Sequence, residues 1–392
     1  MKFAQTTGTL EAAALPLAAS ANMTRGVAKA AERLASLDVM RGLAVVGMII
    51  VNALATSRDD GFAPGFAFLS HSPWAGFTLA DFVFPAFIFM AGFSVAASLR
   101  RRTHLDWQLF RRISARTAAL VVLGFLLTNI SWFGHMDHGD WRCFGVLQRI
   151  GLCYFATAIL FVICGPRTRL AVALLVLLAY WPLTLFPIPG QATDLLIPGA
   201  NFISHVDHIV LGPHVFLVGP HAYDPEGILS TLPAIAQCLL GALAGEWLLN
   251  NRHANSAALK LSACGAATLA LGLVWSPFFP IVKNIWTSSY VLVSTGLVML
   301  LLALCYWALD RRRIRFGGMT VLQAFGMNAL LAYVLQGAAQ LLPAGNDMHA
   351  IGAASLTMYA PAMMASAPIL VFLVMLWIPL EFLRRRRWIV KI

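Results

Sequence analysis

Long apolar stretches recur along the whole chain, separated by shorter segments that carry most of its charged residues. Each stretch can cross ~30 Å of hydrocarbon as an α-helix, and the alternating pattern of outer-membrane barrel strands is absent from the sequence. The pattern predicts about ten membrane-spanning helices, at residues 38–57, 78–99, 113–132, 145–164, 168–187, 227–249, 257–276, 287–309, 318–341 and 361–383. We therefore expect an all-α polytopic membrane protein.

The ten stretches form one predicted transmembrane domain, residues 33–392, because no linker of polar composition divides them. Residues 1–32 are rich in alanine and interrupted by Glu11, so we interpret them as a mobile cytoplasmic N-terminal segment rather than a signal peptide. The longest segment between apolar stretches, about 188–226, is rich in Pro and Gly and has no Lys or Arg. A loop of this length is often functional, and we predict a lid on the outer side.

Composition agrees with this pattern, since 59% of the residues are hydrophobic and only 11% are charged. A net charge of +11 would suggest nucleic acid as the partner of a soluble chain, but the distribution of the charge matters more. All but four of the 28 Lys and Arg fall on one predicted side; the exceptions are Arg58, Arg142, Arg149 and Lys283. The positive-inside rule then places both termini in the cytoplasm, so the expected partner is a lipid bilayer and not nucleic acid.

Neither cysteine nor histidine spacing predicts a metal centre. Of six cysteines only Cys143 falls outside the apolar stretches, so no disulfide framework follows. His135 and His138 have a His-x-x-His spacing with acidic neighbours, which a zinc site would use, but the segment offers no clear third ligand. We expect no metal.

The first candidate for chemistry is His71, which precedes the second apolar stretch. Thr78 and Asp81 have capping-box spacing, which predicts that the helix begins near Thr78 and leaves His71 on an outer loop. An imidazole fixed at a membrane surface suits proton transfer or nucleophilic attack. The alternative is an interfacial histidine beside the belt residue Trp74.

Polar residues inside apolar stretches are the next candidates. Asn52 lies near the outer end of the first predicted helix, as a site residue or as an amide that joins helices. Gln148 and Arg149 lie one turn inside the fourth. A buried arginine is expensive, so Arg149 should face a polar cavity and pair with Asp81 or an anionic ligand, unless it extends to the outer surface.

Two charged groups complete the candidates. Arg100, Arg101 and Arg102 lie on an inner loop, where they suit the phosphates of an anionic ligand or the headgroups of anionic lipids. Asp224 and Glu226 lie at the mouth of the sixth predicted helix, where they suit the hydroxyls or amine of a sugar, or favourable charge at a helix N-terminus.

Several motifs occur together in a specific order: Ser36-Leu37-Asp38-x-x-Arg41-Gly42, Val51-Asn52, His71-x-x-Trp74-x-Gly76-x-Thr78-x-Ala80-Asp81-x-Val83-Phe84-Pro85, Gly145-Val146-Leu147-Gln148-Arg149, Asp224-Pro225-Glu226-Gly227 and Gly326-Met327-Asn328. This set resembles the heparan-alpha-glucosaminide N-acetyltransferase family, including its bacterial NagX-type members. The resemblance implies an integral-membrane acetyltransferase that takes the acetyl group of cytoplasmic acetyl-CoA and transfers it to a glucosamine-type sugar on the outer side. It also implies a multi-pass protein of the bacterial inner membrane.

The resemblance implies that His71 and Asn52 are the catalytic pair. We expect Arg149, Gln148 and Arg100–Arg102 to bind coenzyme A, and Trp74, Asp81, Asp224 and Glu226 to contact the amino sugar. Two departures stand out: 19 positions separate Asn52 from His71, and Ala75 replaces an expected asparagine.

Three alternatives remain open from the sequence. The same polar outer cavity suits an inner-membrane transporter for N-acetylglucosamine or a related amino sugar. An acetyl-CoA hydrolase-like or degenerate member of the family would release CoA without acetylating a sugar. A weaker likeness, through Leu37-Asp38-x-x-Arg41-Gly42, is to the type 3 membrane acyltransferases. The acceptor is not identified, direct transfer is not distinguished from an acetyl-histidine intermediate, and a homodimer is left open.

Overall fold

A computed structural model describes residues 34–59, 68–130, 132–134, 141–190, 192–219, 221–339 and 361–390. Within these residues the protein is helical, with two isolated β-bridges, Ala75–Val282 and Leu217–Tyr223, and no strand. The all-α class is therefore confirmed for the described part of the chain. The predicted N-terminal segment 1–32 and the His-x-x-His motif lie outside it.

A helix occupies each of the ten predicted stretches. They are α2 (Ala35–Asp59), α3 (Leu79–Leu99), α4 (Trp107–Thr128), α5 (Val146–Ile163), α6 (Pro166–Thr184), α8 (Thr231–Asn250), α9 (Ala257–Trp275), α10 (Ser288–Cys305), the pair α11 (Met319–Met327) and α12 (Ala329–Ala339), and α14 (Pro361–Arg385). Among the described helices, seven are long and apolar enough to cross a membrane, or eight if the pair α11–α12 counts as one span. Ten crossings and the cytoplasmic position of the termini stay predictions.

The predicted span over 318–341 is broken into two helices, because α11 and α12 meet at an angle of 83°. Asn328 lies at the break, and its side chain accepts a hydrogen bond from the backbone N–H of Val390 (2.9 Å) and donates one to the carbonyl of Trp388 (3.2 Å). α11 also approaches α2 so closely that a Cβ on Gly326 would lie 1.7 Å from the carbonyl oxygen of Asp38. These contacts with distant parts of the chain accompany the bend, and hydropathy alone does not show them.

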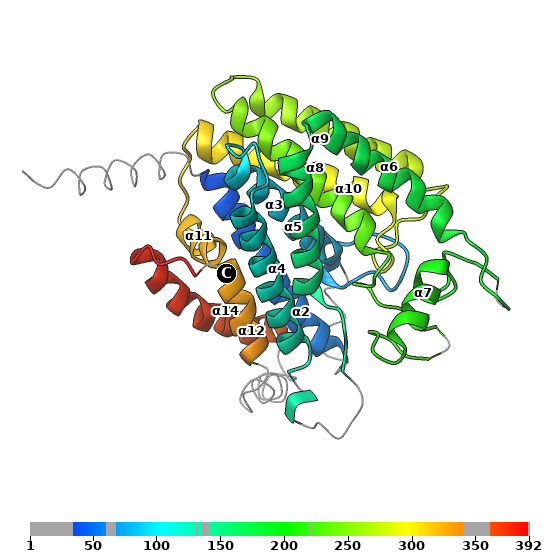
Figure 1. Ribbon diagram of the computed structural model, residues 1–392. Coiled ribbons are helices and arrows are strands. Elements are labelled where there is room, and N and C mark those ends of the chain that lie inside the picture. Colours follow the sequence, from blue (N-terminus) through cyan, green and yellow to red (C-terminus); the bar gives the residue numbers. More distant parts are fainter. Residues whose placement is uncertain are drawn as a thin grey trace, which may run out of the picture.

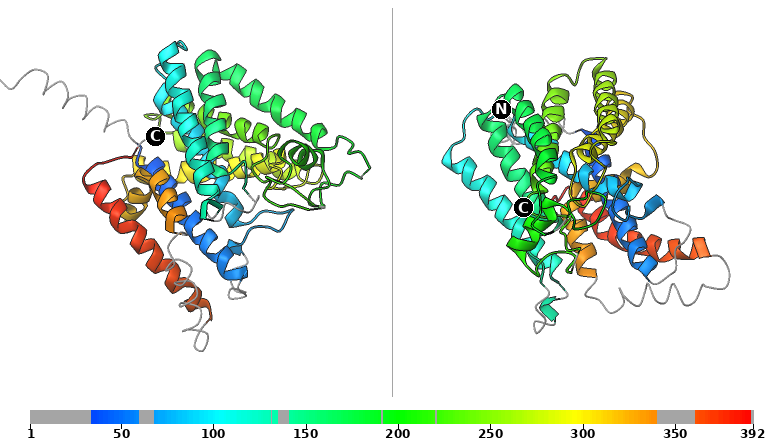
Figure 2. Two further views of the ribbon diagram at one scale, coloured as in Figure 1. Left: turned by 60° about the horizontal axis from the view of Figure 1, so that its bottom comes forward. Right: turned by 90° about the vertical axis from the view of Figure 1, so that its right-hand side faces the viewer.

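The helices are arranged in three groups (Figure 1). α3, α5 and α8 lie in the middle, α6, α9 and α10 cover one side, and α11, α12 and α14 lie on the other. The most extensive contacts join α9 to α10, α3 to α8, α2 to α11 and α4 to α5. Figure 2 shows α14 along the edge of the molecule, beside α12.

Glycines allow the backbones of α3 and α8 to approach each other closely. A Cβ on Gly92 would lie 1.8 Å from the carbonyl oxygen of Cys238, and one on Gly241 would lie 2.1 Å from that of Phe89. Such small residues allow helix backbones to approach closely in membranes, where packing rather than the hydrophobic effect holds helices together. This seam fixes the position of α3, whose two ends carry the candidate sites described below.

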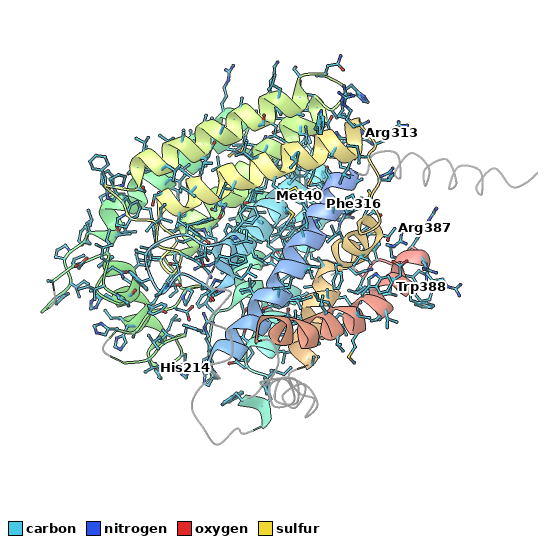
Figure 3. All side chains as sticks on the ribbon, turned by 180° about the vertical axis from the view of Figure 1, so that it is seen from behind. Met40, His214, Arg313, Phe316, Arg387 and Trp388 are labelled. Atoms are coloured by element: carbon cyan, nitrogen blue, oxygen red, sulfur yellow. The ribbon has the colours of Figure 1, made fainter. Side chains whose placement is uncertain are left out.

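The predicted outer loop 188–226 is not structureless. It contains the short helix α7 (Phe202–Leu211), whose cap Asn201 accepts a hydrogen bond from the backbone N–H of Ser204 at 2.9 Å. Figure 3 shows His214 of this segment far from Arg313 and Arg387, which lie toward the opposite end of the molecule. The separation agrees with the predicted division into a side poor in Lys and Arg and a side rich in them.

Candidate active site

Asp81 caps α3 and also holds His71. Its Oδ2 accepts hydrogen bonds from the backbone N–H of Thr78 (3.1 Å) and of Ser72 (3.2 Å), while its Oδ1 lies 2.8 Å from His71 Nδ1. The predicted capping box between Thr78 and Asp81 is present, and the helix begins at Leu79. The Asp81 side chain is 1% exposed and the His71 side chain 43% exposed. A buried carboxylate therefore holds an imidazole that solvent can reach.

Lys283 is the third member of this site, which sequence reasoning missed. Its Nζ lies 2.8 Å from His71 Nδ1 and 3.3 Å from Asp81 Oδ1. Burial lowers the pKa of the Lys283 ammonium, and the neighbouring carboxylates of Asp81 and Glu226 counter only part of that effect. In the sequence analysis, Lys283 stands out only as one of four positive charges on the predicted outer side. Its partner is 212 residues away in the chain, so local spacing gives no signal.

The loop that carries Lys283 is fixed to the loop that carries His71. Ala75 and Val282 form a β-bridge, and the backbone N–H of Gly76 donates to the carbonyl of Ile281 at 2.8 Å. Gly76 has a φ of 121°, which favours glycine at this turn. On the other side of Lys283, the hydroxyl of Thr287 accepts from the backbone N–H of Val282 at 3.0 Å. Lys283 is therefore positioned by the hydrogen bonds of its neighbour Val282.

His71 Nδ1 lies beside one hydrogen-bond acceptor and one hydrogen-bond donor. An ionised carboxylate only accepts hydrogen bonds and an ammonium only donates them, so Nδ1 cannot satisfy Asp81 and Lys283 in the same protonation state. With a proton on Nδ1 the ring donates to Asp81 and its Nε2 becomes a base. Without that proton the ring accepts from Lys283 and carries its proton on Nε2. The arrangement can therefore change which ring nitrogen is basic.

Arg149 neither extends to the outer surface nor pairs with Asp81, and its contact with an anionic ligand stays a prediction. The residue is fully buried. Its Nη2 donates to the carbonyl of Gly227 (3.2 Å) and to the hydroxyl of Ser230, and its guanidinium lies 5.0 Å from the centre of the Trp286 ring. Its Nε and Nη1 have no hydrogen-bond partner among the described residues.

Asp224 and Glu226 are paired with Arg142, a contact that the sequence did not predict. Arg142 binds Asp224 through Nε (3.0 Å) and Nη2 (2.5 Å), and its Nη2 also donates to Glu226. Burial raises the pKa of Glu226, but Arg142 and Arg149 outweigh burial and hold that pKa below its usual value. Because a guanidinium already occupies both carboxylates, contact with a sugar stays a prediction for Asp224 and Glu226.

The two remaining residues of the predicted outer site differ in exposure. Trp74 is buried, and its indole N–H donates to the carbonyl of Leu195 at 2.9 Å, as a structural residue would. Asn52 is exposed near the end of α2. Ile50 and Leu69 pack around the same residue, Ile369, which brings this end of α2 toward the segment that leads to His71.

A basic cavity of about 530 Å³ lies at the opposite end of α3. Arg102, Arg112 and Arg116 line it together with Tyr154, and the Arg116 guanidinium lies 4.7 Å from the centre of the Tyr154 ring. Arg100 and Arg101 are outside the lining. The residues predicted to bind coenzyme A are therefore divided, because Arg102 lies at this end while Gln148 and Arg149 begin α5 near the outer site.

Comparison with known proteins agrees with the sequence motifs. Residues 33–277 match the family model described as heparan-alpha-glucosaminide N-acetyltransferase, catalytic. The chain is 29% identical over 358 residues to the human heparan-alpha-glucosaminide N-acetyltransferase, which covers 77% of this chain and 52% of the human protein. The mouse protein of the same name is 30% identical over 359 residues, covering 78% of this chain and 53% of its own length. The chain thus spans about half the length of these curated relatives.

The matched region contains His71, Asp81 and Arg149, and it ends before Lys283. Because the family model covers more than half of the chain, the chain belongs to the heparan-alpha-glucosaminide N-acetyltransferase family.

Proposed function

We propose that this protein transfers the acetyl group of acetyl-CoA to the amine of a glucosamine-type sugar across a membrane. The observation that carries the proposal is the outer site, where the buried Asp81 holds the exposed His71 and a primary amine lies 2.8 Å from the ring. That amine belongs to Lys283, and its position supports the view that an amine can approach this imidazole closely. Family membership supports the reaction class.

In the proposed reaction His71 acts as the base. Asp81 accepts a hydrogen bond from Nδ1–H, which leaves Nε2 free to remove a proton from the attacking sugar amine. The new bond joins the sugar nitrogen to the acetyl carbon, the carbon–sulfur bond breaks, and the CoA thiolate takes up a proton. Asn52 would donate to the thioester oxygen or hold the imidazole. General-base catalysis of this kind contributes roughly 10² to 10⁴ in rate.

An acetyl-histidine intermediate uses the same residues in another order. His71 Nε2 would attack the thioester first, and the sugar amine would then take the acetyl group from the ring. The two routes differ in kinetics, because only the second releases CoA before the sugar binds. Rapid-quench measurement of CoA in the absence of sugar separates them.

The basic cavity at the far end of α3 is the proposed site for the phosphates of acetyl-CoA. Arg102, Arg112 and Arg116 supply guanidinium groups, which bind phosphate through paired hydrogen bonds. By the positive-inside rule this end faces the cytoplasm, in the proposed setting of a bacterial inner membrane. We expect the Arg102→Gln/Arg112→Gln variant to raise the KM for acetyl-CoA at least tenfold while the KM for the sugar changes little.

The test of the function is reconstitution in liposomes, with acetyl-CoA on one side and glucosamine on the other. We expect acetylated sugar and free CoA to appear together, and His71→Ala and Asn52→Ala to abolish or strongly reduce both. His104→Ala, at an exposed histidine of the loop after α3, is the matched control and should retain transfer. Labelled sugar that crosses the bilayer without any CoA release would replace the acetyltransferase by a transporter.

Sidedness is tested by labelling in the same liposomes. A cysteine introduced at Ser72 should react with an impermeant maleimide from the side that receives the sugar, and one introduced at His104 from the side that receives acetyl-CoA. Labelling of both positions from one side would contradict the proposed division of donor and acceptor.

A further inference from the structure

We propose that Lys283 is itself an acetyl acceptor, so that the protein acetylates its own Nζ when an acetyl thioester reaches His71. The inference rests on the proposed function for the identity of the donor. It adds a modification site, and it adds Lys283 as an acetyl acceptor besides the sugar. The residues that carry it are Lys283, His71 and Asp81.

Distance and burial set Lys283 apart from the other described lysine. Its Nζ lies 2.8 Å from His71 Nδ1 and 3.4 Å from Nε2, so an acyl group that arrives at either nitrogen arrives beside this amine. The Lys283 side chain is 15% exposed. Lys260, by contrast, is exposed at the start of α9 and serves as an internal control.

The surroundings of Lys283 favour the reactive form of its amine. An amine attacks a thioester only when it is neutral, and burial lowers the pKa of Lys283 toward that form. The nearby imidazole can accept the proton that the amine gives up. The β-bridge between Ala75 and Val282 keeps the lysine beside the ring.

The step balances as an aminolysis. The neutral Nζ attacks the acetyl carbon, a nitrogen–carbon bond forms and the carbon–sulfur bond breaks. His71 takes the proton lost by nitrogen and the CoA thiolate receives it. The products are free CoA and an acetylated Lys283. Because an amide is far less reactive than a thioester, the acetyl group does not pass on to the sugar.

Acetylation changes the site in two ways. It removes the positive charge that lies 3.3 Å from Asp81 Oδ1, leaving His71 as the partner of that oxygen. It also places an amide where the amine of the sugar would approach. We therefore expect the modification to inhibit transfer, most strongly when acetyl-CoA is abundant and the sugar is scarce.

The experiment measures acetyl groups on individual lysines by mass spectrometry. Reconstituted protein is incubated with isotope-labelled acetyl-CoA without sugar, and the occupancy of Lys283 and Lys260 is followed with time. We expect Lys283 to react at least tenfold faster than Lys260, and His71→Gln to bring the two rates together. Transfer activity should fall in proportion to Lys283 occupancy, and Lys283→Arg should abolish that time-dependent loss.

A second donor separates this inference from the proposed function. p-Nitrophenyl acetate needs no coenzyme A site, so it reports the reactivity of Lys283 alone. Selective labelling by this reagent without any reaction of acetyl-CoA would support the acceptor role of Lys283 and contradict the proposed donor. Equal labelling of Lys283 and Lys260 by both donors, or sugar transfer with Lys283 left unmodified, would overturn the inference. Thermal unfolding of His71→Gln shows whether that variant is folded, and Lys283→Arg gives an independent test.

Discussion

Two clusters of charged residues lie on the predicted outer side, and they differ in how completely their charges are matched. In the closed cluster, Arg142, Asp224 and Glu226, one guanidinium binds two buried carboxylates. In the open cluster, His71, Asp81 and Lys283, two groups compete for one ring nitrogen and the imidazole reaches solvent. Charge alone therefore does not mark a functional site. An exposed titratable group with unsettled proton positions is the better indicator.

The largest expected effect is the loss of the closed cluster. Arg142→Gln leaves two buried carboxylates without the cation that forms a salt bridge with both, which costs about 3 to 5 kcal/mol of stability. Thermal unfolding in detergent measures the loss. Arg167→Gln, at an exposed arginine of α6, is the matched control and should change stability by less than about 0.5 kcal/mol. An Arg142→Gln protein as stable as its parent would mean that the closed cluster is not structural.

The open cluster should respond in activity instead. Asp81→Asn keeps an oxygen that can cap α3 but removes the charge that fixes the proton on His71 Nδ1. We expect transfer to fall by at least 10²-fold, or about 2.7 kcal/mol in the barrier, with stability changed by about 1 kcal/mol. Steady-state rates and thermal unfolding measure the two quantities. Full activity in Asp81→Asn would remove Asp81 from the mechanism.

Asp207 sharpens the comparison, because it adds a carboxyl group to the neighbourhood of the closed cluster and forms no salt bridge among the described residues. Burial raises its pKa from 3.8 to about 7, although the backbone N–H of Ile228 donates to it at 2.8 Å and partly offsets burial. The folded protein therefore holds a proton between about pH 4 and pH 7 that the unfolded chain has released. The free energy of unfolding should fall by up to about 1.4 kcal/mol for each pH unit as the pH rises through that window, and level off above it.

Asp207→Asn should remove most of this pH dependence, because an amide keeps an oxygen that can accept from Ile228 but does not ionise. Unfolding temperatures of both proteins between pH 5 and pH 8 test it. Parallel curves for the two proteins would show that another group carries the titration.

The smallest expected effect concerns Trp74, which the sequence analysis assigned to the sugar. Because its indole is buried and donates to Leu195, we expect Trp74→Phe to cost about 1 kcal/mol of stability and to leave the KM for the sugar within twofold. A tenfold rise in that KM, measured on a variant of normal stability, would restore the substrate-binding interpretation.

Local signals in the sequence predicted local structure well. The start of α3 follows from Thr78 and Asp81, because a capping box involves residues only three positions apart. The positions of the helices follow from hydropathy, since an apolar stretch inside a membrane must satisfy its backbone N–H and C=O groups by hydrogen bonds within the stretch itself. His71 could be singled out because it directly precedes one of these helices.

Contacts between distant segments were not predictable. Lys283 reaches His71 across 212 residues, and Arg142 reaches Asp224 across 82. Both appeared in the sequence only as positive charges on the outer side. The bend at Asn328 was missed for the same reason, since the partners of its side chain lie 60 and 62 residues further along the chain. A pattern of apolar residues shows where helices lie in the sequence, but it does not show which helices pack against one another.

The glycine seam between α3 and α8 has a mechanical consequence. α3 begins at the open cluster and ends at the basic cavity, and its 21 residues make it about 30 Å long. Gly92 and Gly241 bring backbone against backbone in the middle of this helix, so α8 holds α3 closely in place there. The helix therefore keeps the two sites at a fixed distance from each other. If both ends serve one reaction, the ligand has to span or travel the distance, because the protein cannot shorten it.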